Sequence, residues 1–439
     1  MASPHPPMTF RVSPRPPFLH LLVALSLGSL VGSPLPAQTP LPEAAPGLAI
    51  PATDDGLAGR GPIRRMDWFQ RLWLERRTGW AARKSQDQGA VVFLGDSITQ
   101  GWAGLGGVFP GLKVANRGIS GDTTRGVLYR LREDVLTLQP RAVVLLIGTN
   151  DLEEMAEPEV ASGNVALILD ALQQHQPTLP VVLCAVFPSA ASKKRPSDKI
   201  IRLNQLLFAL LKERPQVTFL DTWALFAGDK GDARAEEFPD LLHPNARAYL
   251  KWGRALRPIL ETLQLVPAWP DDFAPEPGFI SLFNGRDLSG WSYLDKPAPE
   301  GSTATPDDRF VVRNGRLVVT VSRLLRAYAR LQTVRTYPRD FELQLEFRAS
   351  PNADSGVFVR GPQLQCRDFL IAGPYLDLQR YRPLDWNELI VTVRGGLARA
   401  TCNGEVLVEA FPVPADGPIG FESDHGQIEY RRIRLKESP

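Results

Sequence analysis

Four short polar motifs hold the kinds of side chain that nucleophilic catalysis needs, namely serine, histidine, aspartate and asparagine. Each motif stands at the end of an apolar run or directly before an amphipathic one. They are Gly95-Asp96-Ser97 after 90–94, Asn116-Arg117-Gly118 after 112–115, Gly148-Thr149-Asn150-Asp151 after 142–147, and Asp240-Leu241-Leu242-His243 before 245–263. Since the carboxyl ends of parallel strands share one edge of a sheet, this order predicts a single site at that edge.

Ser97 and His243 are the predicted nucleophile and base. A serine hydroxyl attacks poorly until a neighbouring base removes its proton, and histidine suits that role near neutral pH. Asp240 precedes His243 by three residues and can hold the imidazole in the required tautomer. An alternative is that Asp240 and His243 only cap the following helix. The other histidines stand in a predicted signal peptide, at a helix end or in a late turn: His5, His20, His175 and His425.

A negative charge develops on the carbonyl oxygen when a nucleophile attacks an ester, and it needs donors that are already in place. The predicted donors of this oxyanion hole are the backbone N–H groups of Ser97 and Gly118 and the side-chain amide of Asn150. The alternative for Asn150 is that it only braces its turn. Asp96 and Asp151 are expected to accept hydrogen bonds from turn N–H groups rather than to take part in chemistry.

On these motifs, residues 61–263 resemble the SGNH (GDSL-type) hydrolases, a family named after its serine, glycine, asparagine and histidine. The corresponding positions here are Ser97, Gly118, Asn150 and His243, with Asp240 before the histidine. The resemblance implies a three-layer α/β fold of the flavodoxin-like kind. It also implies ester hydrolysis, often the removal of an acetyl group.

The elements that must position these residues can be read from hydrophobic periodicity. Helical spacing of Trp68, Leu72, Trp73 and Arg76 predicts a first amphipathic helix over 67–84. Near-continuous apolar runs that alternate with helical stretches then predict a parallel sheet covered on both faces. The predicted strands are 90–94, 112–115, 142–147, 180–187 and 217–220, and the predicted helices between them are 125–138, 158–175 and 197–212.

The pattern changes after a proline-rich linker over 264–277. In 341–347 apolar and polar residues alternate, which is typical of a half-buried strand, and 389–393 repeats this with one exception. Asn314-Gly315 and Asn403-Gly404 are strong hairpin signals, and Gly395-Gly396 is a further turn signal. Residues 278–437 are therefore predicted to form an antiparallel β-sandwich.

This second half resembles the 3-keto-disaccharide hydrolase domain, a concanavalin-like jelly roll. The matching segments are 279–285 with 288–291, 354–360, 385–388, 417–420 and 425–426. Where that family usually has a Glu-containing strand followed by Asp, this chain has Gln363-Leu364-Gln365-Cys366-Arg367-Asp368. The departure favours sugar binding over hydrolysis. Trp291 and Trp386 are candidate sugar contacts, with burial in the core as the alternative.

Composition argues against several other classes of protein. The net charge is +2 and no long basic block occurs, so nucleic acid is not an expected partner. Lys193-Lys194-Arg195 is interpreted as a short solvated loop. Neither Cys-x-x-Cys nor His-Glu-x-x-His occurs, so no metal site is predicted, and no cofactor is expected. Whether Cys366 and Cys402 form a disulfide stays open, since spacing does not fix their geometry.

The first 37 residues have the order of a secretory signal peptide. Arg11 and Arg15 precede an apolar stretch over 18–31, and Pro34-Leu35-Pro36-Ala37 follows. The apolar stretch is too short to span a membrane, so no stable membrane insertion is expected once the signal is removed. These features predict a periplasmic or secreted protein. Residues 38–60, rich in proline, alanine and glycine, are predicted to be a linker.

Together the two halves predict an exported serine esterase that acts on a small-molecule or polysaccharide ester. Deacetylation of a carbohydrate is the favoured reaction, with the second domain binding the sugar. Two alternatives stay open. The second domain could be the main enzyme and cleave a glycoside with carboxylates, or the first domain could be a lipase or thioesterase. Intact motifs argue against a third alternative, a binding protein with a vestigial site.

Overall fold

The computed structural model of the 439-residue chain describes residues 47–438, except 212, 213, 215, 268–272, 320–328, 352, 368–374, 376 and 425. The predicted signal peptide, the predicted linker up to residue 46 and His425 lie outside the described residues. Within the described ranges, none of the helices is long and apolar enough to cross a bilayer.

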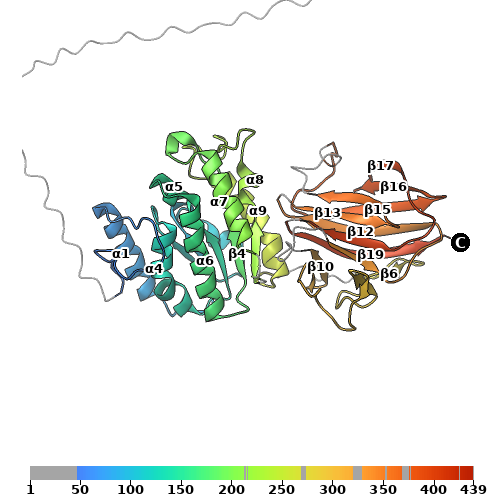
Figure 1. Cartoon of the computed structure of the whole chain (residues 1–439), viewed down its shortest axis with the longest axis horizontal. Helices are drawn as coiled ribbons and strands as arrows, with labels where there is room; N and C mark the ends of the chain where they lie inside the picture. The colour runs from blue at the N-terminus through green and yellow to red at the C-terminus, as the bar shows by residue number, and fades with distance from the viewer. Residues whose placement is uncertain are drawn as a thin grey trace, which may run out of the picture. The chain divides into compact units, whose positions relative to one another are not determined.

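The first domain is a parallel sheet with helices on both faces (Figure 1). Its strand order, β2-β1-β3-β4-β5, is the flavodoxin-like order, so the predicted fold is confirmed. The strands are β1 (Val91–Gly95), β2 (Val114–Gly118), β3 (Ala142–Leu146), β4 (Val181–Cys184) and β5 (Val217–Leu220). The helices are α1 (Asp67–Ala82), α2 (Ser97–Gln100), α3 (Leu105–Val108), α4 (Thr124–Asp134), α5 (Thr149–Glu153), α6 (Pro158–His175), α7 (Ser197–Ala209), α8 (Thr222–Phe226) and α9 (Ala246–Thr262).

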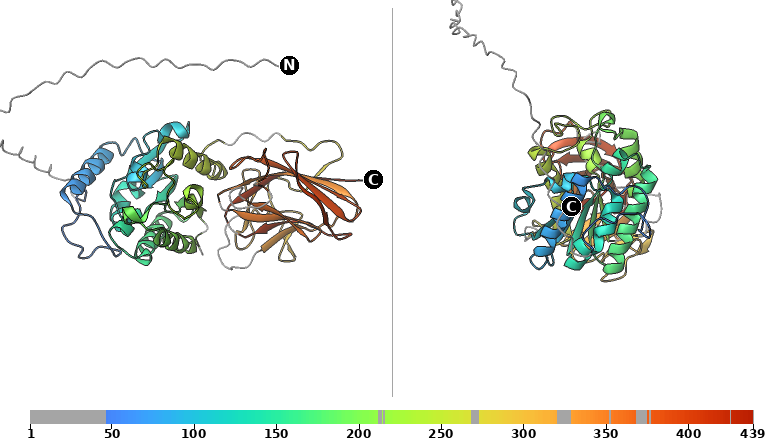
Figure 2. Two further views of the ribbon diagram at one scale, coloured as in Figure 1. Left: turned by 90° about the horizontal axis from the view of Figure 1, so that it is seen from above. Right: turned by 90° about the vertical axis from the view of Figure 1, so that its left-hand side faces the viewer.

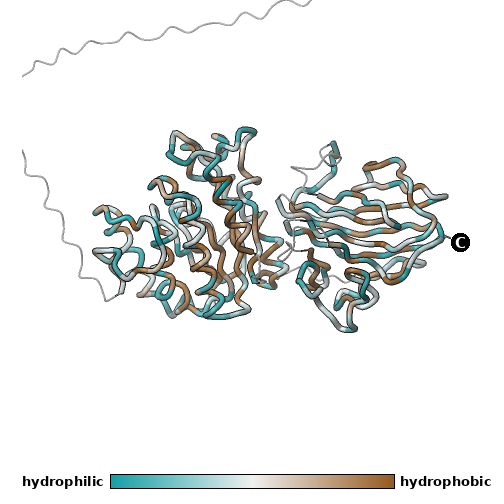
Figure 3. The backbone as a smooth tube through the Cα atoms, viewed as in Figure 1, coloured by the Kyte–Doolittle hydropathy of each residue, from teal (hydrophilic) through white to brown (hydrophobic). Residues whose placement is uncertain are grey.

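Alternate side chains of each strand feed two separate apolar cores, which is why the strands are hydrophobic on both faces. One core joins Val92, Val143 and Val181 to apolar residues of α4, α6 and α7. The other joins Val91 and Val144 to residues of α2, α3, α8 and α9. In Figure 3, the brown of hydrophobic residues runs along the strands of this sheet.

The observed strand β2 begins and ends later than predicted, so that it contains Arg117 and Gly118. A buried arginine breaks the apolar pattern on which the prediction rested. Here the charge is compensated, because the guanidinium donates to Asp87 at 2.7 Å and to the carbonyl of Asp134 at 3.0 Å. Its partners come from elsewhere in the chain, so a reading of local hydropathy could not find this strand residue.

The predicted linker is wrong for residues 47–60, which are bound to the domain rather than free. Trp73 and Arg77 of α1 are buried and donate to the carbonyl of Leu48 at 2.9 and 2.8 Å. Arg60 donates its N–H to Asn164 of α6 at 3.0 Å. Buried donors need acceptors, and this irregular segment supplies them. Helix α1 itself, blue in Figure 2, packs on α4 through the rings of Trp73 and Tyr129.

The second domain is a sandwich of antiparallel strands, as predicted. In the described part of the chain, one sheet has the order β17-β16-β15-β12-β19-β10-β9 with β6 added beside β19, and the other has the order β14-β13-β18-β11-β7-β8. The strands are β6 (Ile280–Ser281), β7 (Trp291–Tyr293), β8 (Lys296–Pro297), β9 (Phe310–Arg313), β10 (Arg316–Val319), β11 (Ala329–Thr333), β12 (Phe341–Ala349), β13 (Asp354–Val359), β14 (Gln363–Arg367), β15 (Asn387–Arg394), β16 (Leu397–Cys402), β17 (Glu405–Pro412), β18 (Ile419–Ser423) and β19 (Ile428–Glu437).

The predicted turns are the hairpin turns of this sandwich. Asn314 and Gly315 join β9 to β10 with φ values of 51° and 73°, and Asn403 and Gly404 join β16 to β17 with 49° and 79°. Two consecutive left-handed residues are the hairpin geometry that matches the twist of the strands, and asparagine followed by glycine tolerates it best.

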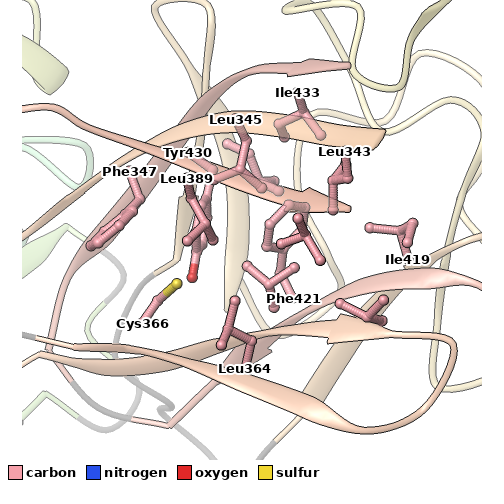
Figure 4. Packing of buried hydrophobic residues seen from close by; sticks show 14 of the residues in the cluster. Leu343, Leu345, Phe347, Leu364, Cys366, Leu389, Ile419, Phe421, Tyr430 and Ile433 are labelled. Carbon is pink, nitrogen blue, oxygen red and sulfur yellow. The ribbon is translucent and has the colours of Figure 1, made fainter. Parts of the chain in front are cut away.

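Between the sheets, Leu343 and Leu345 of β12 pack in one apolar core with Phe421 of β18 (Figure 4). Cys366 and Cys402 both lie in this core as free thiols, so the structure contains no bridge between them. Burial raises the pKa of each thiol to about 12, which makes both unreactive at neutral pH.

Candidate active site

Ser97, His243 and Asp240 are linked by two consecutive hydrogen bonds. The Nε2 atom of His243 lies 3.0 Å from the Oγ of Ser97, and its Nδ1 lies 2.7 Å from an oxygen of Asp240. Ser97 and His243 are 146 residues apart in sequence, so the fold brings them together. The two ring nitrogens therefore face a hydroxyl and a carboxylate, which is the arrangement in which a base removes a proton while its other nitrogen is held.

Two local structures position the ends of this hydrogen-bonded series. Ser97 is the first residue of α2, directly after β1, and Asp96 caps that helix by accepting from the N–H of Ile98 at 2.9 Å. Asp240 accepts from the N–H groups of Leu242 at 3.1 Å and His243 at 2.7 Å, which closes a tight turn. The turn fixes the carboxylate against the imidazole of the same motif.

The pKa of Asp240 is about 2. Partial burial by itself would raise this pKa, but hydrogen bonds from the backbone and ring of His243 outweigh the burial. The carboxylate is therefore charged throughout the neutral and mildly acidic range. The alternative in which Asp240 and His243 cap the following helix is wrong, because Asn245 caps α9 by accepting from Ala248 at 3.0 Å.

The structure does not support Gly118 as an oxyanion donor. Its N–H already donates to the side chain of Asn116 at 3.0 Å. The residue is glycine for a packing reason, since a β-carbon there would overlap the backbone of Gln100 and lie 2.7 Å from the carbonyl oxygen of Asp96. Gly118 thus allows β2 to approach the helix that carries Ser97, and its amide is not available to a ligand.

A different glycine of the same segment has an available amide. Gly121 adopts a left-handed φ of 86°, and in the described part of the chain its N–H has no acceptor. The residues on both sides of Gly121 are held: Ser120 donates to Gln100 of α2 at 2.8 Å, and Asp122 accepts from the Nδ2 of Asn150 at 2.9 Å. Gly121 therefore lies between the helix of Ser97 and the amide of Asn150.

Sequence reasoning missed Arg195, and the prediction of a solvated loop there is wrong. Lys194 is exposed, but Arg195 is buried, and its guanidinium donates to the Oδ1 of Asn150 at 2.9 Å and to the carbonyl of Thr149 at 3.1 Å. Asn150 thus receives a charged donor at its oxygen and keeps one hydrogen of its Nδ2 uncommitted in the described structure. A run of three basic residues gives no signal that one of them is turned inward.

Three buried carboxylates lie beneath the site: Asp96, Asp122 and Asp151. Asp151 accepts from both the N–H and the hydroxyl of Thr124 at 2.9 and 2.5 Å, so it is bonded to a helix terminus rather than exposed to a substrate. Desolvation raises the pKa of Asp96 and of Asp151 to about 7, and that of Asp122 to about 6. Their mutual repulsion acts in the same direction.

A raised carboxyl pKa makes stability depend on pH in a defined direction. Between the unfolded value of 3.8 and about 7, the folded protein binds a proton at Asp96 that the unfolded chain does not. Stability should therefore fall as pH rises through this range. Asp96→Asn should flatten the fall in Tm between pH 5 and 7.5 by a few degrees, measured by calorimetry. Asp55→Asn, at an exposed position, is the control; an unchanged slope in Asp96→Asn would contradict the burial argument.

The two tryptophans predicted to contact sugar differ in their surroundings. Trp291 is 1% exposed and packs on Phe421 in the core of the sandwich, so the alternative of a core residue holds for it. Trp386 is half-buried, and the guanidinium groups of Arg348 and Arg431 lie 4.7 and 4.0 Å from its ring. Trp386 also lines a pocket with these two arginines, so it stays a candidate sugar contact.

The comparisons with known proteins agree with this architecture. Residues 93–251 match the GDSL-like lipase/acylhydrolase family, and residues 278–436 match the 3-keto-alpha-glucoside-1,2-lyase-like domain. The alpha2 subunit of human platelet-activating factor acetylhydrolase IB is 30% identical over 207 residues, which cover 46% of this chain and 87% of that protein. The bovine alpha1 subunit is 30% identical over 195 residues, covering 43% of this chain and 82% of that protein.

Among solved structures, a GDSL-like lipase from Bacteroides thetaiotaomicron is 25% identical, with a TM-score of 0.38, and covers 42% of this chain and 97% of that one. The hydrogen-bonded site, the flavodoxin-like strand order and the matched segment define a hydrolase domain of the GDSL (SGNH) kind that acts on ester bonds. The chain belongs to the GDSL-like lipase/acylhydrolase family, and its second domain is of the 3-keto-alpha-glucoside-1,2-lyase-like kind.

Proposed function

We propose that this protein is an exported serine esterase that removes acetyl groups from a carbohydrate, with Ser97, His243 and Asp240 as its catalytic residues. The observation that carries the proposal is the unbroken line from the Asp240 carboxylate through the His243 ring to the Ser97 hydroxyl, at 2.7 and 3.0 Å.

In the first half of the reaction, His243 accepts the proton of Ser97 while the Oγ attacks the ester carbonyl. The charged Asp240 stabilises the imidazolium that forms. As the tetrahedral intermediate collapses, the carbon–oxygen bond to the alcohol breaks and His243 gives its proton to the departing oxygen. In the second half, a water molecule repeats the attack on the acylated Ser97, releases the acid and restores the hydroxyl.

The oxyanion of this mechanism is bound by the N–H of Ser97, the N–H of Gly121 and the Nδ2 of Asn150. Gly121 replaces Gly118 in this role because its amide is uncommitted among the described residues. Arg195 acts as a positioning residue. Its charge-assisted bond at 2.9 Å keeps the oxygen of Asn150 turned away from the site and polarises the amide.

Asn150→Ala should lower kcat by about 10²–10³ with little change in KM, the usual effect of losing one donor to an oxyanion. Arg195→Met should lower kcat less, because the donor remains but is no longer oriented. The double variant should be no slower than Asn150→Ala alone, since Arg195 acts through that amide. Steady-state kinetics of the four proteins on one soluble acetate ester would measure this.

Lys194→Met, at the exposed neighbouring position, is the matched control and should have wild-type kinetics. Independent losses that multiply in the double variant would show that Arg195 does not act through Asn150. A rise in KM with unchanged kcat in Asn150→Ala would make that residue a binder of the ground state.

Two observations favour an acetylated carbohydrate as substrate. The related platelet-activating factor enzymes are acetylhydrolases by name, and the attached domain belongs to a kind named for a glucoside. The test is a screen of the full chain with acetylated sugars, longer-chain acyl esters and acyl thioesters. Fastest turnover on acetylated sugars is expected, whereas preference for long acyl chains or thioesters would favour the lipase or thioesterase alternative.

We propose a binding role for the second domain, with glycoside cleavage as the alternative. The full-length Ser97→Ala variant should be retained on an acetylated polysaccharide gel and should release no reducing sugar from keto-glycosides. Cleavage of a glycoside by this variant would show that the second domain is itself the main enzyme. Export to the periplasm or outside the cell is part of the proposal, and rests on the residue pattern of 1–37.

A further inference from the structure

Helix α1 has one aromatic side chain that its core does not use. Phe69, Trp73 and Trp80 are all buried, but Trp68 is 45% exposed. The helix predicted from the spacing of Trp68 and Trp73 is present, but only Trp73 of these two is buried. An indole is a large, flat apolar surface, and the protein leaves nearly half of this one open to a ligand.

The exposed indole lies against Gly121. A β-carbon on Gly121 would lie 2.8 Å from the Cη2 of Trp68 and 3.0 Å from an Nη of Arg64, which explains why this position has no side chain. Gly121 is the residue whose uncommitted N–H is assigned above to the oxyanion. The edge of the indole therefore lies next to the residue whose N–H would bind the ester carbonyl.

This segment is also fixed relative to Ser97. Ser120 donates to Gln100, which ends the one-turn helix that Ser97 begins, and Asp122 accepts from Asn150. Trp68 itself is held at its inner side by an edge-to-face contact with Phe69, with ring centroids 5.6 Å apart. The exposed indole is therefore a pre-formed surface beside the catalytic serine, because neither its helix nor its contact segment needs to move.

The charges around Trp68 indicate which part of an ester it would bind. Arg64, which shares the contact with Gly121, donates to Glu154 at 2.6 Å and also pairs with Glu153. A flat aromatic surface bordered by charged, hydrogen-bonding groups suits a sugar ring, which has apolar C–H faces and polar hydroxyl edges. An acyl chain would have to desolvate these charges without replacing their hydrogen bonds.

We propose that Trp68 is the stacking platform for the sugar ring of the alcohol part of the ester, with Arg64 and Glu154 at its polar edge. This deepens the proposed function and rests on it. It also places sugar recognition in the first domain, beside the nucleophile, whereas Trp291 of the second domain is buried in its own core.

The test compares Trp68→Ala and Trp68→Phe on two acetate esters, an acetylated methyl glucoside and methyl acetate, which has no ring to stack. Trp68→Ala should raise KM for the acetylated glucoside about tenfold, leave its kcat nearly unchanged, and leave hydrolysis of methyl acetate unaffected. Trp68→Phe should recover part of the loss. Leu167→Ala, at a similarly exposed apolar residue on α6, is the control and should match the wild type.

Binding can be measured without turnover in the Ser97→Ala background, by titrating the acetylated glucoside and following tryptophan fluorescence. Adding Trp68→Ala should weaken binding about tenfold. Equal effects of Trp68→Ala on both esters, or unchanged binding, would refute the stacking role of Trp68 without contradicting the proposed esterase activity. A larger loss on a long-chain acyl ester would assign the indole to the acyl chain instead. A wild-type enzyme that hydrolyses methyl acetate but binds no acetylated sugar would overturn both the platform and the proposed substrate.

Discussion

Ser97→Ala should lower the rate of ester hydrolysis by roughly 10⁴- to 10⁶-fold, because the covalent step is lost and only binding and the oxyanion donors remain. The variant should fold normally. In the described structure, the side chain of Ser97 is half-exposed and its hydroxyl is hydrogen-bonded to His243, so removing the hydroxyl leaves no buried partner unsatisfied. Initial rates on a soluble acetate ester, with Tm measured in parallel, would test both statements.

The matched control is Ser120→Ala, which removes a hydroxyl from the neighbouring segment and should keep most of the activity. A Ser97→Ala variant with a rate within tenfold of the wild type and an unchanged Tm would show that the measured hydrolysis does not use this serine.

His243→Ala should cause a loss of the same order as Ser97→Ala, since the two groups act as one unit and removal of either abolishes proton transfer. The double variant should be no slower than either single one. Asp240→Asn should be less damaging, because the base remains and only its orientation and charge partner are lost. Single-turnover kinetics with these four proteins would separate the chemical step from binding.

The pH profile distinguishes His243 from Asp240. Because the pKa of Asp240 is about 2, this carboxylate stays charged when the medium is mildly acidic. A protonated imidazole cannot accept the proton of Ser97, so activity should fall on acidification while Asp240 is still ionised. Activity that persists undiminished through pH 4 would contradict a histidine base and would favour a carboxylate mechanism in the second domain.

The parts of the site that could be predicted are those that depend on local sequence. Gly95-Asp96-Ser97 follows a strand that is buried on both faces, and such strands appear as apolar runs. Asp240 and His243 lie in one turn, so their contact follows from their spacing. The contact between His243 and Ser97 could be expected because both motifs flank the same edge of a parallel sheet.

The parts that could not be predicted depend on partners distant in sequence. Whether Gly118 or Gly121 offers a free N–H is decided by the orientation of the Asn116 side chain, which no local pattern encodes. In the sequence, Arg195 is one of three consecutive basic residues. In the structure its side chain is buried and donates to Asn150, which lies 45 residues earlier. Burial of Trp291 and exposure of Trp68 similarly depend on which neighbours pack beside them.

The most direct test of the account is covalent labelling of the serine itself. A fluorophosphonate reacts with a serine whose hydroxyl proton is removed by a base. The oxyanion donors of the site bind the phosphoryl oxygen of the probe. Intact-mass and peptide analysis of the labelled full-length protein should show one added group, on Ser97. Labelling should be lost in Ser97→Ala and strongly slowed in His243→Ala. A label on another serine, or full labelling of the His243→Ala variant, would contradict the assignment of Ser97 and His243 as nucleophile and base.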